Sequence, residues 1–271
     1  ATLSSATGTI TVPASTGSIT ATVTPINDAL SEGAETVNIK ITSPSSPYNI
    51  LDSVAAINII DDEATLISTI QGTGAAATAG NFTIEGIVTG VYTTLSPAGF
   101  YMQEEDADKD SNPATSEGIF VVTSNTVAVG DKVRVSGTVL ESSAAPSYNQ
   151  AVISSTAINT ISTGNPLPAY TNISLPLTDI NDYEKYECML VRFQDTLTVT
   201  DNYNLGRYGE INLSKDGMTF QPTQIVDPND AIASGTSSTG TSNLTAVNAY
   251  ADANSLRTIL MDDGKGTMTA L

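Results

Sequence analysis

Short runs in which apolar and polar residues alternate recur along most of the chain. Clear examples lie at residues 8–13, 18–24, 82–91 and 129–139. Because successive side chains of a β-strand point to opposite faces, this pattern predicts half-buried strands. No stretch keeps a helical period for long, and segments with Gly, Pro, Asn or Asp separate the runs. We therefore expect the 271 residues to be all-β and to form two or three compact domains.

The charge balance limits the partners of this chain. It holds 29 acidic and 10 basic residues, which gives a net charge of −19. Such a surface repels the phosphate backbone of nucleic acids unless cations or a local basic patch intervene, so tight autonomous binding of DNA or RNA is not expected. No apolar run approaches the roughly 18–20 residues that a membrane-spanning helix needs, and no membrane insertion is expected.

The chain contains no histidine and a single cysteine, Cys188. The lack of histidine excludes His-dependent triads and His-ligated zinc within this chain. One cysteine cannot form an intrachain disulfide, and the apolar neighbours of Cys188 favour a buried, inert thiol. We therefore expect no catalytic site among these residues.

An acidic loop lies between two apolar runs at residues 99–103 and 118–122. Its side chains have the spacing of a twelve-residue calcium loop, with donors at positions 1, 3, 5 and 12. Ser111 stands where such loops usually have glycine, and the loop joins strands rather than helices, so it is not a standard EF-hand. The spacing predicts a Ca²⁺ site, with a solvated acidic loop as the alternative. The candidate ligands are Asp106, Asp108, Asp110, Asn112 and Glu117.

Residues 1–64 contain a D-x-x-x-E-G-x-E element at 28–35 and end on I-I-D-D-E at 59–63. In order and spacing, these elements resemble the C-terminal half of a Calx-β domain, a sandwich module. The resemblance implies a truncated sandwich in which loop acids and terminal acids meet at one end and bind calcium. Many such modules are stalk units, so a structural spacer stays open. The implied ligands are Asp28, Glu32, Asp61, Asp62 and Glu63.

Residues 65–164 suggest about five strands with a long first strand, which predicts an OB-like barrel. Gly86 and Gly90 in that first strand predict a bend or bulge. The runs I-x-x-I-Q-G-x-G, I-E-G-I-V-T, G-F-Y-M-Q, T-S-E-G-I-F-V and G-D-K-V-R-V-S-G-T-V resemble the OB-fold region of large bacterial extracellular nucleases. Alternation would place half of the candidate contact residues in the core, and a purely structural barrel is the alternative. The candidates are Tyr92, Phe100, Tyr101, Lys132 and Arg134.

Residues 165–271 are expected to form a further mostly-β domain with one short helix at 177–187, capped by Thr178 or Asp179. An Asp-Gly pair at 216–217 predicts a hairpin turn, and the Ser/Thr/Gly-rich residues 234–243 predict a flexible insertion. The runs L-T-V-T-D-N-Y-N-L-G-R-Y-G-E-I and L-M-D-D-G resemble the same nuclease region.

The loop after residue 201 has two interpretations. Tyr203, Arg207 and Tyr208 could contact a DNA strand or a neighbouring nuclease domain, since an Arg between tyrosines can stack and pair with phosphate. Alternatively, the tyrosines are buried and Arg207 pairs with Glu210 or a nearby Asp.

In the nuclease family that the chain resembles, this region precedes a DNase I-like endonuclease/exonuclease/phosphatase domain. That chemistry needs paired histidines and acids that hold Mg²⁺, so the resemblance implies that they lie in a catalytic domain beyond residue 271. The chain is then a non-catalytic, Ca²⁺-stabilised accessory region of a secreted nuclease that projects the missing domain. Its expected partners are upstream β-modules and the downstream nuclease domain of its own polypeptide, with a weak nucleic-acid contact left open.

The alternative function belongs to another class. It is a stalk or adhesin-like array of calcium-rigidified β-modules with no enzymatic role. Both hypotheses place the protein outside the cell, either secreted or at the cell surface.

Overall fold

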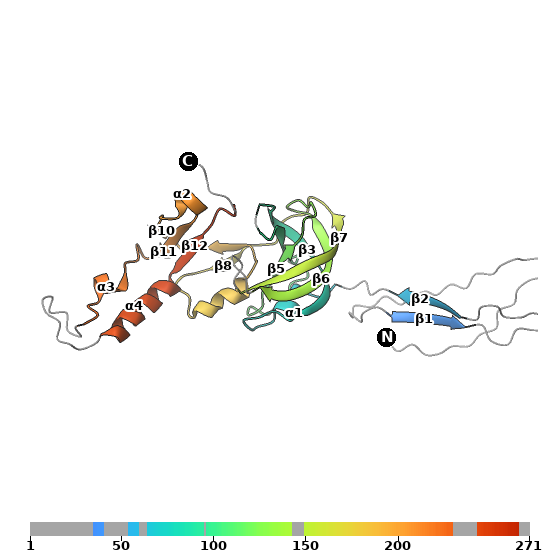
Figure 1. Cartoon of the computed structure of the whole chain (residues 1–271), viewed down its shortest axis with the longest axis horizontal. Helices are drawn as coiled ribbons and strands as arrows, with labels where there is room; N and C mark the ends of the chain where they lie inside the picture. Colours follow the sequence, from blue (N-terminus) through green and yellow to red (C-terminus); the bar gives the residue numbers. More distant parts are fainter. Residues whose placement is uncertain are drawn as a thin grey trace, which may run out of the picture. The chain divides into compact units, whose positions relative to one another are not determined.

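The computed structural model of the chain describes residues 35–40, 54–59, 64–94, 96–142, 149–229 and 243–265. These residues form mostly β-structure in several sheets, as the alternating pattern predicts. The chain divides into two compact units, Ala1–Ala64 and Thr65–Leu271. Figure 1 labels most of the elements of both units.

In the first unit, the described residues form an antiparallel pair of strands, β1 (Glu35–Lys40) and β2 (Val54–Ile59). Val37 and Ile39 of β1 are half-buried, while the residues that alternate with them are exposed. The strand thus has the one-sided burial that its alternating sequence predicts. The strands predicted at residues 8–13 and 18–24 lie outside the described residues.

Five strands of the second unit form a closed barrel. The strand order around the barrel is β3-β4-β5-β7-β6, and β6 also pairs with β3, so the sheet forms a ring. Neighbouring strands are antiparallel except β5 and β7, which are parallel. The strands are β3 (Gly80–Tyr92), β4 (Gly99–Gln103), β5 (Gly118–Val122), β6 (Lys132–Ser142) and β7 (Gln150–Ser162).

The long strand β3 changes partner along its length. Its first part pairs with β6 and its last part with β4, with a register shift between Val88 and Gly90. This shift confirms the bend that the glycines predict.

Gly99 lies at the start of β4, where the strand comes very close to β5. A Cβ at this position would overlap the carbonyl oxygen of Val121 on β5. Only glycine allows the two strands to approach this closely there.

Apolar side chains from all five strands and from a short helix, α1 (Ile67–Gln71), fill the barrel. Ile67 and Ile70 of α1 are almost completely buried in this core. Phe100, one of the predicted contact residues, is a core residue as well, with 1% of its surface exposed. The other members of the core are Ile84, Val88, Met102, Ile119, Val121, Val133, Val135, Val139, Ala151 and Ile153.

The remainder of the second unit contains two further sheets. β8 (Thr171–Ile173) and β9 (Val191–Phe193) form a parallel pair. β10 (Leu197–Asp201), β11 (Ile211–Lys215) and β12 (Thr258–Met261) form an antiparallel sheet in that order. Leu175, between β8 and β9, is the most buried residue of a small separate core.

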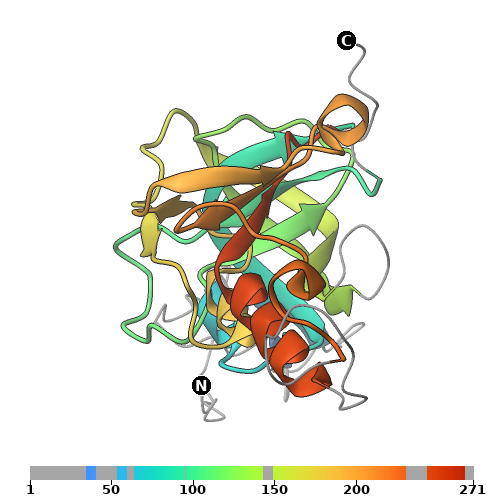
Figure 2. The same ribbon diagram turned by 90° about the vertical axis from the view of Figure 1, so that its left-hand side faces the viewer.

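Helices are more numerous in this part than the sequence pattern suggests. They are α2 (Leu205–Tyr208), α3 (Pro222–Ile225) and α4 (Leu244–Leu256), in addition to a 3₁₀ helix, η1 (Ile180–Tyr186). α3 and α4 lie side by side (Figure 1 and Figure 2). The expectation of one short helix is therefore wrong.

Within the described part of the chain, no helix is long and apolar enough to cross a membrane.

The 3₁₀ helix η1 confirms the helix predicted at 177–187 and its cap. The Asp179 carboxylate accepts a hydrogen bond from the N–H of Asn181 at 2.9 Å. The Asp182 carboxylate in turn accepts one from the N–H of Asp179 at 3.2 Å, which completes a capping box.

The Asp-Gly pair forms a turn, but the predicted hairpin is wrong. Asp216 and Gly217 both have positive φ, 60° and 90°, as such a turn requires. However, β11 pairs with β10 and β12, and the residues after Gly217 lead to α3 rather than into a strand. The Arg257 guanidinium donates hydrogen bonds to the carbonyls of Lys215 at 2.8 Å and Met218 at 3.3 Å. These carbonyls on both sides of the turn are thus engaged by a side chain.

Residues 187–190, between η1 and β9, attach the rest of the second unit to the barrel through hydrogen bonds, and we call them the joining segment. The hydroxyl of Ser116 donates to the carbonyl of Glu187 at 2.6 Å, and the N–H of Ala151 donates to its carboxylate at 2.6 Å. The N–H of Leu190 donates to Oε1 of Gln103 at 2.8 Å. The segment is therefore bonded to β4, to β7 and to the end of the acidic loop.

We expect Gly99→Ala to lower the free energy of unfolding of the second unit by about 1–3 kcal/mol, because the added methyl group would overlap the backbone of β5. Gly74→Ala is the matched control, since a Cβ there meets nothing within 4 Å. Thermal unfolding followed by circular dichroism measures both variants. Equal midpoints would contradict the close approach of β4 and β5.

Candidate metal and nucleic-acid contact sites

The acidic loop connects β4 to β5, and its outer side is tied down by Asp106. Oδ1 of Asp106 pairs with Nζ of Lys109 at 3.3 Å. Oδ2 accepts a hydrogen bond from the N–H of Ala169 at 3.1 Å. Both oxygens of this predicted ligand are thus engaged, one of them by the segment that follows the barrel.

The middle of the loop is organised by its own side chains. Oδ1 of Asp110 accepts a hydrogen bond from the N–H of Asn112 at 2.7 Å, and Thr115 donates to Oδ2 at 2.9 Å. Oδ1 of Asn112 accepts one from the N–H of Ala114 at 3.1 Å. Oε1 of Glu117 accepts one from the N–H of Asp110 at 3.1 Å. These local turns are typical of Asp and Asn and give the loop a definite shape.

The described residues bring together no group of three or more acidic, histidine or cysteine side chains placed to hold a metal ion. Among the predicted ligands of the acidic loop, Glu117 accepts a hydrogen bond from the backbone N–H of Asp110, whereas the Asp106 carboxylate forms an ion pair with Lys109. The ligands implied by the Calx-β resemblance lie outside the described residues. They are Asp28, Glu32, Asp61, Asp62 and Glu63. Calcium binding at either place stays a prediction.

A buried pair of carboxyl groups closes the base of the loop. Glu104 follows β4 and Glu117 precedes β5, and only 3% and 5% of their surfaces are exposed. The N–H of Glu104 donates to the carbonyl of Glu117 at 3.1 Å, so the two residues continue the β4–β5 ladder. Oε1 of Glu104 accepts a hydrogen bond from the N–H of Ile67 at the start of α1. The pair thus connects three parts of the barrel.

The electrostatics of this pair are unusual. Burial, followed by the contact with Glu117, raises the pKa of Glu104 to about 9. Burial raises the pKa of Glu117 as well. Two ionised carboxylates would repel each other strongly in this buried place, so a proton on Glu104 that is donated to Glu117 relieves the repulsion. The calcium-loop spacing did not identify Glu104. Gln103 of β4 pairs with Gly118 of β5, and extending this pairing by one residue places Glu104 opposite Glu117.

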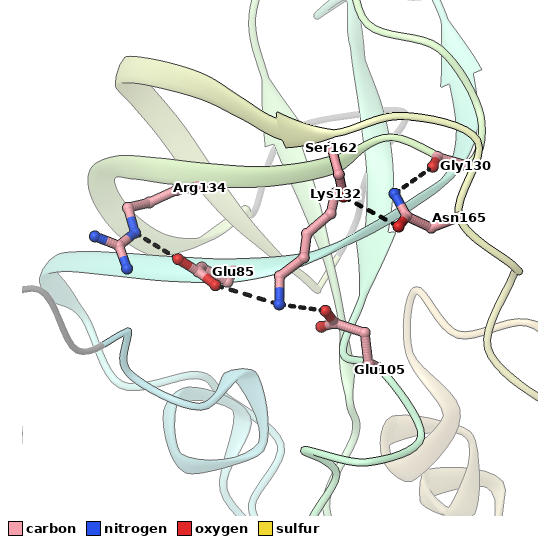
Figure 3. Close-up of polar contacts among 7 residues, drawn as sticks. All are labelled: Glu85, Glu105, Gly130, Lys132, Arg134, Ser162 and Asn165. Carbon is pink, nitrogen blue, oxygen red and sulfur yellow. Dashed lines mark hydrogen bonds and ion pairs between the residues drawn. The ribbon is translucent and has the colours of Figure 1, made fainter. Parts of the chain in front are cut away.

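Two of the predicted contact residues, Lys132 and Arg134, belong to an ion-pair network between β3, β6 and the acidic loop (Figure 3). Glu85 pairs with Nε of Arg134 at 2.5 Å and with Nζ of Lys132 at 3.5 Å. Glu105 pairs with Nζ of Lys132 at 2.5 Å and raises the pKa of that lysine. The positive charge of both side chains is therefore largely balanced by the protein's own carboxylates.

A row of aromatic rings lies on β3, β4 and β5. Tyr92 and Tyr101 meet edge to face at 5.4 Å between ring centroids, and Tyr101 lies 4.8 Å from Phe120. Phe120 is only 2% exposed, and the joining segment packs directly against β5 beside it. The ring of Tyr92 lies against Gly264. The chain thus covers much of this aromatic row itself.

The loop around α2 carries exposed aromatic and basic side chains. Tyr203 is 89% exposed and Tyr208 is 44% exposed. The guanidinium of Arg207 lies 5.0 Å from the centre of the Tyr208 ring. Glu210 accepts a hydrogen bond from Asn204 at 2.8 Å, and within the described residues Arg207 forms no ion pair. The alternative with buried tyrosines and an Arg207–Glu210 pair is therefore wrong.

The single thiol is half-buried and lies in the joining segment. The side-chain amide of Gln150 approaches Sγ of Cys188 at 3.2 Å. Burial raises the pKa of the thiol well above its usual value, so it is protonated and unreactive at neutral pH. The inert thiol that the sequence predicts is consistent with this environment.

A cavity of about 10 Å³ lies where the barrel meets η1 and the joining segment. Glu141, Glu184 and Glu187 line it. Burial raises the pKa of Glu187 to about 7, and the charges of Glu141 and Glu184 act in the same direction. Because the folded state favours the protonated form of Glu187, stability falls as the pH rises from the ordinary pKa of a glutamate through about 7.

We expect Glu187→Gln to raise the melting temperature by about 2–4 °C at pH 8 and by much less at pH 5. The amide oxygen keeps the hydrogen bond from Ala151 but cannot ionise. Glu210→Gln, which removes one charge next to α2, is the control and should show no such dependence on pH. Differential scanning calorimetry at both pH values measures the effect. A gain that is equal at both pH values would contradict the raised pKa of Glu187.

The chain has no match among protein-family models, among curated proteins or among solved structures. The resemblance to the accessory region of extracellular nucleases therefore rests on sequence motifs. Support for a function comes from these motifs and from the chemistry of the described residues.

Proposed function

We propose that this chain is a non-catalytic, calcium-stabilised accessory region of a secreted nuclease. It projects a nuclease domain that this chain does not contain and helps to present nucleic acid to it. The observation that carries the proposal is the strand order β3-β4-β5-β7-β6 with its parallel β5–β7 pair. This order supports the expected OB-like barrel, a kind of fold that often binds oligonucleotides.

The motifs that resemble the nuclease region fall on the elements that build this barrel. G-F-Y-M-Q is β4, and T-S-E-G-I-F-V leads from the acidic loop into β5. I-x-x-I-Q-G-x-G begins with α1, which supplies two core isoleucines. The sequence resemblance and the strand order therefore support the same interpretation.

The surface that suits nucleic acid best is the loop around α2. OB barrels usually bind through the face of their second and third strands, but here the joining segment lies against β5 on that side. Lys132 and Arg134 are already paired with glutamates. Tyr203 and Tyr208 are exposed and can stack on bases, while Arg207 can pair with a phosphate. With a net charge of −19, we expect this contact to be weak and sensitive to salt.

Catalysis is assigned elsewhere because the sequence contains no histidine. A DNase I-like reaction uses histidine as acid and base and Mg²⁺ to stabilise charge, so in this proposal Mg²⁺ belongs to the missing domain only. The location would be outside the cell, either secreted or at the surface, where millimolar calcium could occupy the acidic loops.

We expect the double variant Arg207→Ala/Tyr208→Ala to bind single-stranded DNA at least about fivefold more weakly than the unchanged chain, because one stacking surface and one charge are lost. Fluorescence anisotropy with a labelled oligonucleotide at low salt measures the affinity, with and without Ca²⁺.

The control is Arg192→Ala/Tyr170→Ala. Arg192 lies 4.6 Å from the centre of the Tyr170 ring, and Tyr170 is 49% exposed, so this pair has the same chemistry elsewhere on the surface. Equal losses for both double variants would indicate a non-specific effect of charge and contradict a contact at α2.

A stalk or adhesin-like module without enzymatic role is the second candidate. The observation that favours it is the balanced charge of Lys132 and Arg134, together with the partly covered aromatic row, since both would suit a barrel that only holds its neighbours in place. Absence of DNA binding by the unchanged chain at low salt would support this candidate.

A further inference from the structure

The joining segment covers part of the outer face of the barrel. Its backbone passes so close to β5 that a Cβ on Gly118 would overlap the carbonyl group of Cys188. The side-chain amide of Gln150 lies 3.2 Å from Sγ of Cys188 and 3.2 Å from the hydroxyl of Tyr101. Phe120, the neighbour of Tyr101 in the aromatic row, is 2% exposed. Barrels of the OB type usually bind through this face, so the position of the joining segment determines whether these rings are accessible.

One attachment of the joining segment is made by a group that can ionise. The N–H of Ala151 on β7 donates to the carboxyl group of Glu187 at 2.6 Å, whereas Ser116 donates to the carbonyl of the same residue. At the other end of the segment, the N–H of Leu190 donates to the side chain of Gln103. A change in the charge of Glu187 therefore acts directly on the contact between the segment and the barrel.

Two further glutamates line the same small cavity as Glu187. Glu141 comes from β6 and Glu184 from η1. Within the described residues, no lysine or arginine forms an ion pair with any of the three, and Lys185 pairs with Asp182 instead. The cavity of about 10 Å³ has room for about one water molecule. Three ionised carboxylates here would repel one another with little water to screen them.

The other groups that act on Glu187 do not compensate this charge. The phenol of Tyr101 on β4 and the thiol of Cys188 stay neutral at ordinary pH, because burial raises the pKa of both. The side-chain amide of Gln71 on α1 donates a hydrogen bond to Glu187 but carries no charge. The charged groups that face Glu187 from the packed elements are therefore acidic.

Glu187 consequently holds a proton more tightly when the joining segment is in place. Burial is the largest cause, and the charges of Glu141 and Glu184 add to it, so the pKa of Glu187 is about 7. In a detached segment, the solvated carboxyl group would have its ordinary, lower pKa. The attached form thus binds more protons than the detached form between these two values. A rise in pH through this range favours detachment, and the effect levels off above about pH 7.

We propose that the joining segment is a pH-sensitive cover of the aromatic row. At acidic pH, protonated Glu187 keeps the segment on the barrel. As the pH rises, Glu187 ionises beside Glu141 and Glu184, and the fraction of molecules with a detached segment increases. Tyr101 and Phe120 then become accessible to a ligand that stacks on aromatic rings. The inference goes beyond the proposed function and does not rest on it, because the cover can be tested without nucleic acid.

Cys188 reports on detachment, because it is the only cysteine of the chain and lies in the joining segment. The measurement is the rate at which Ellman's reagent modifies the unchanged chain, divided by the rate for Glu187→Gln at the same pH. The division removes the intrinsic pH dependence of thiol chemistry. Glu187→Gln keeps an acceptor for Ala151 but cannot ionise. We expect the ratio to rise about tenfold from pH 6 to pH 8, as the two pKa values of Glu187 require.

Glu210→Gln is the matched control, since it removes one acidic charge next to α2. Divided by the rate for Glu187→Gln, its rate should follow that of the unchanged chain at every pH. If Glu187→Gln does not fold, Glu141→Gln replaces it, because it removes one facing charge and keeps an acceptor for the N–H of Ala77. The ratio to this variant should still rise with pH, but by less than tenfold.

Urea distinguishes local detachment from unfolding of the whole unit. Detachment of a short segment exposes little surface, so low concentrations of urea should change the reaction rate of Cys188 only slightly. A rate that depends on urea as steeply as global unfolding does would overturn the proposal. A ratio that stays the same from pH 6 to pH 8 would overturn it as well.

Discussion

The second unit depends on the parallel contact between β5 and β7, because the barrel is a closed ring only when these two strands pair. Val121 pairs with Ile153 at its centre, and both side chains are completely buried. Without this contact β5 would be the open edge of a sheet, and the core that α1 completes would lose one wall. Closure also determines where the connections emerge. The acidic loop leaves from one side of β5, and the joining segment is bonded to β4 and β7.

Closure has a consequence for function. The outer aromatic row and the two basic residues of the barrel are largely occupied by contacts within the chain, namely with the joining segment and with Glu85 and Glu105. Features that are free to meet a partner therefore lie on connections. The clearest example is the exposed Arg207–Tyr208 pair, which follows β10. In such an arrangement the barrel is a rigid support, and its connections carry the chemistry.

The alternating pattern was sufficient to predict most strands, because alternation follows directly from one-sided burial. It also identified the bend in β3, and Asp179 marked the start of η1. The pattern failed where contacts between residues far apart in the sequence determine the local structure. The Asp-Gly turn adopts its usual conformation, yet Arg257, forty residues further along, engages the carbonyls on both sides of it. α4 has no fully buried residue and hence no strong periodic signal.

The same dependence on long-range contacts explains why the sequence alone did not identify the Glu104–Glu117 pair. Spacing along the chain selects Asp106 as readily as Glu117, but only the strand register shows that Glu104 lies opposite Glu117 and that Asp106 is tied to Lys109. The most direct test of the account is a crystal structure of the chain grown with Ca²⁺, using anomalous scattering to locate the ion. We expect a metal peak in the acidic loop, held by the candidate ligands between Asp106 and Glu117. A loop that shows no metal peak in millimolar Ca²⁺ would contradict the proposal that calcium stabilises this region.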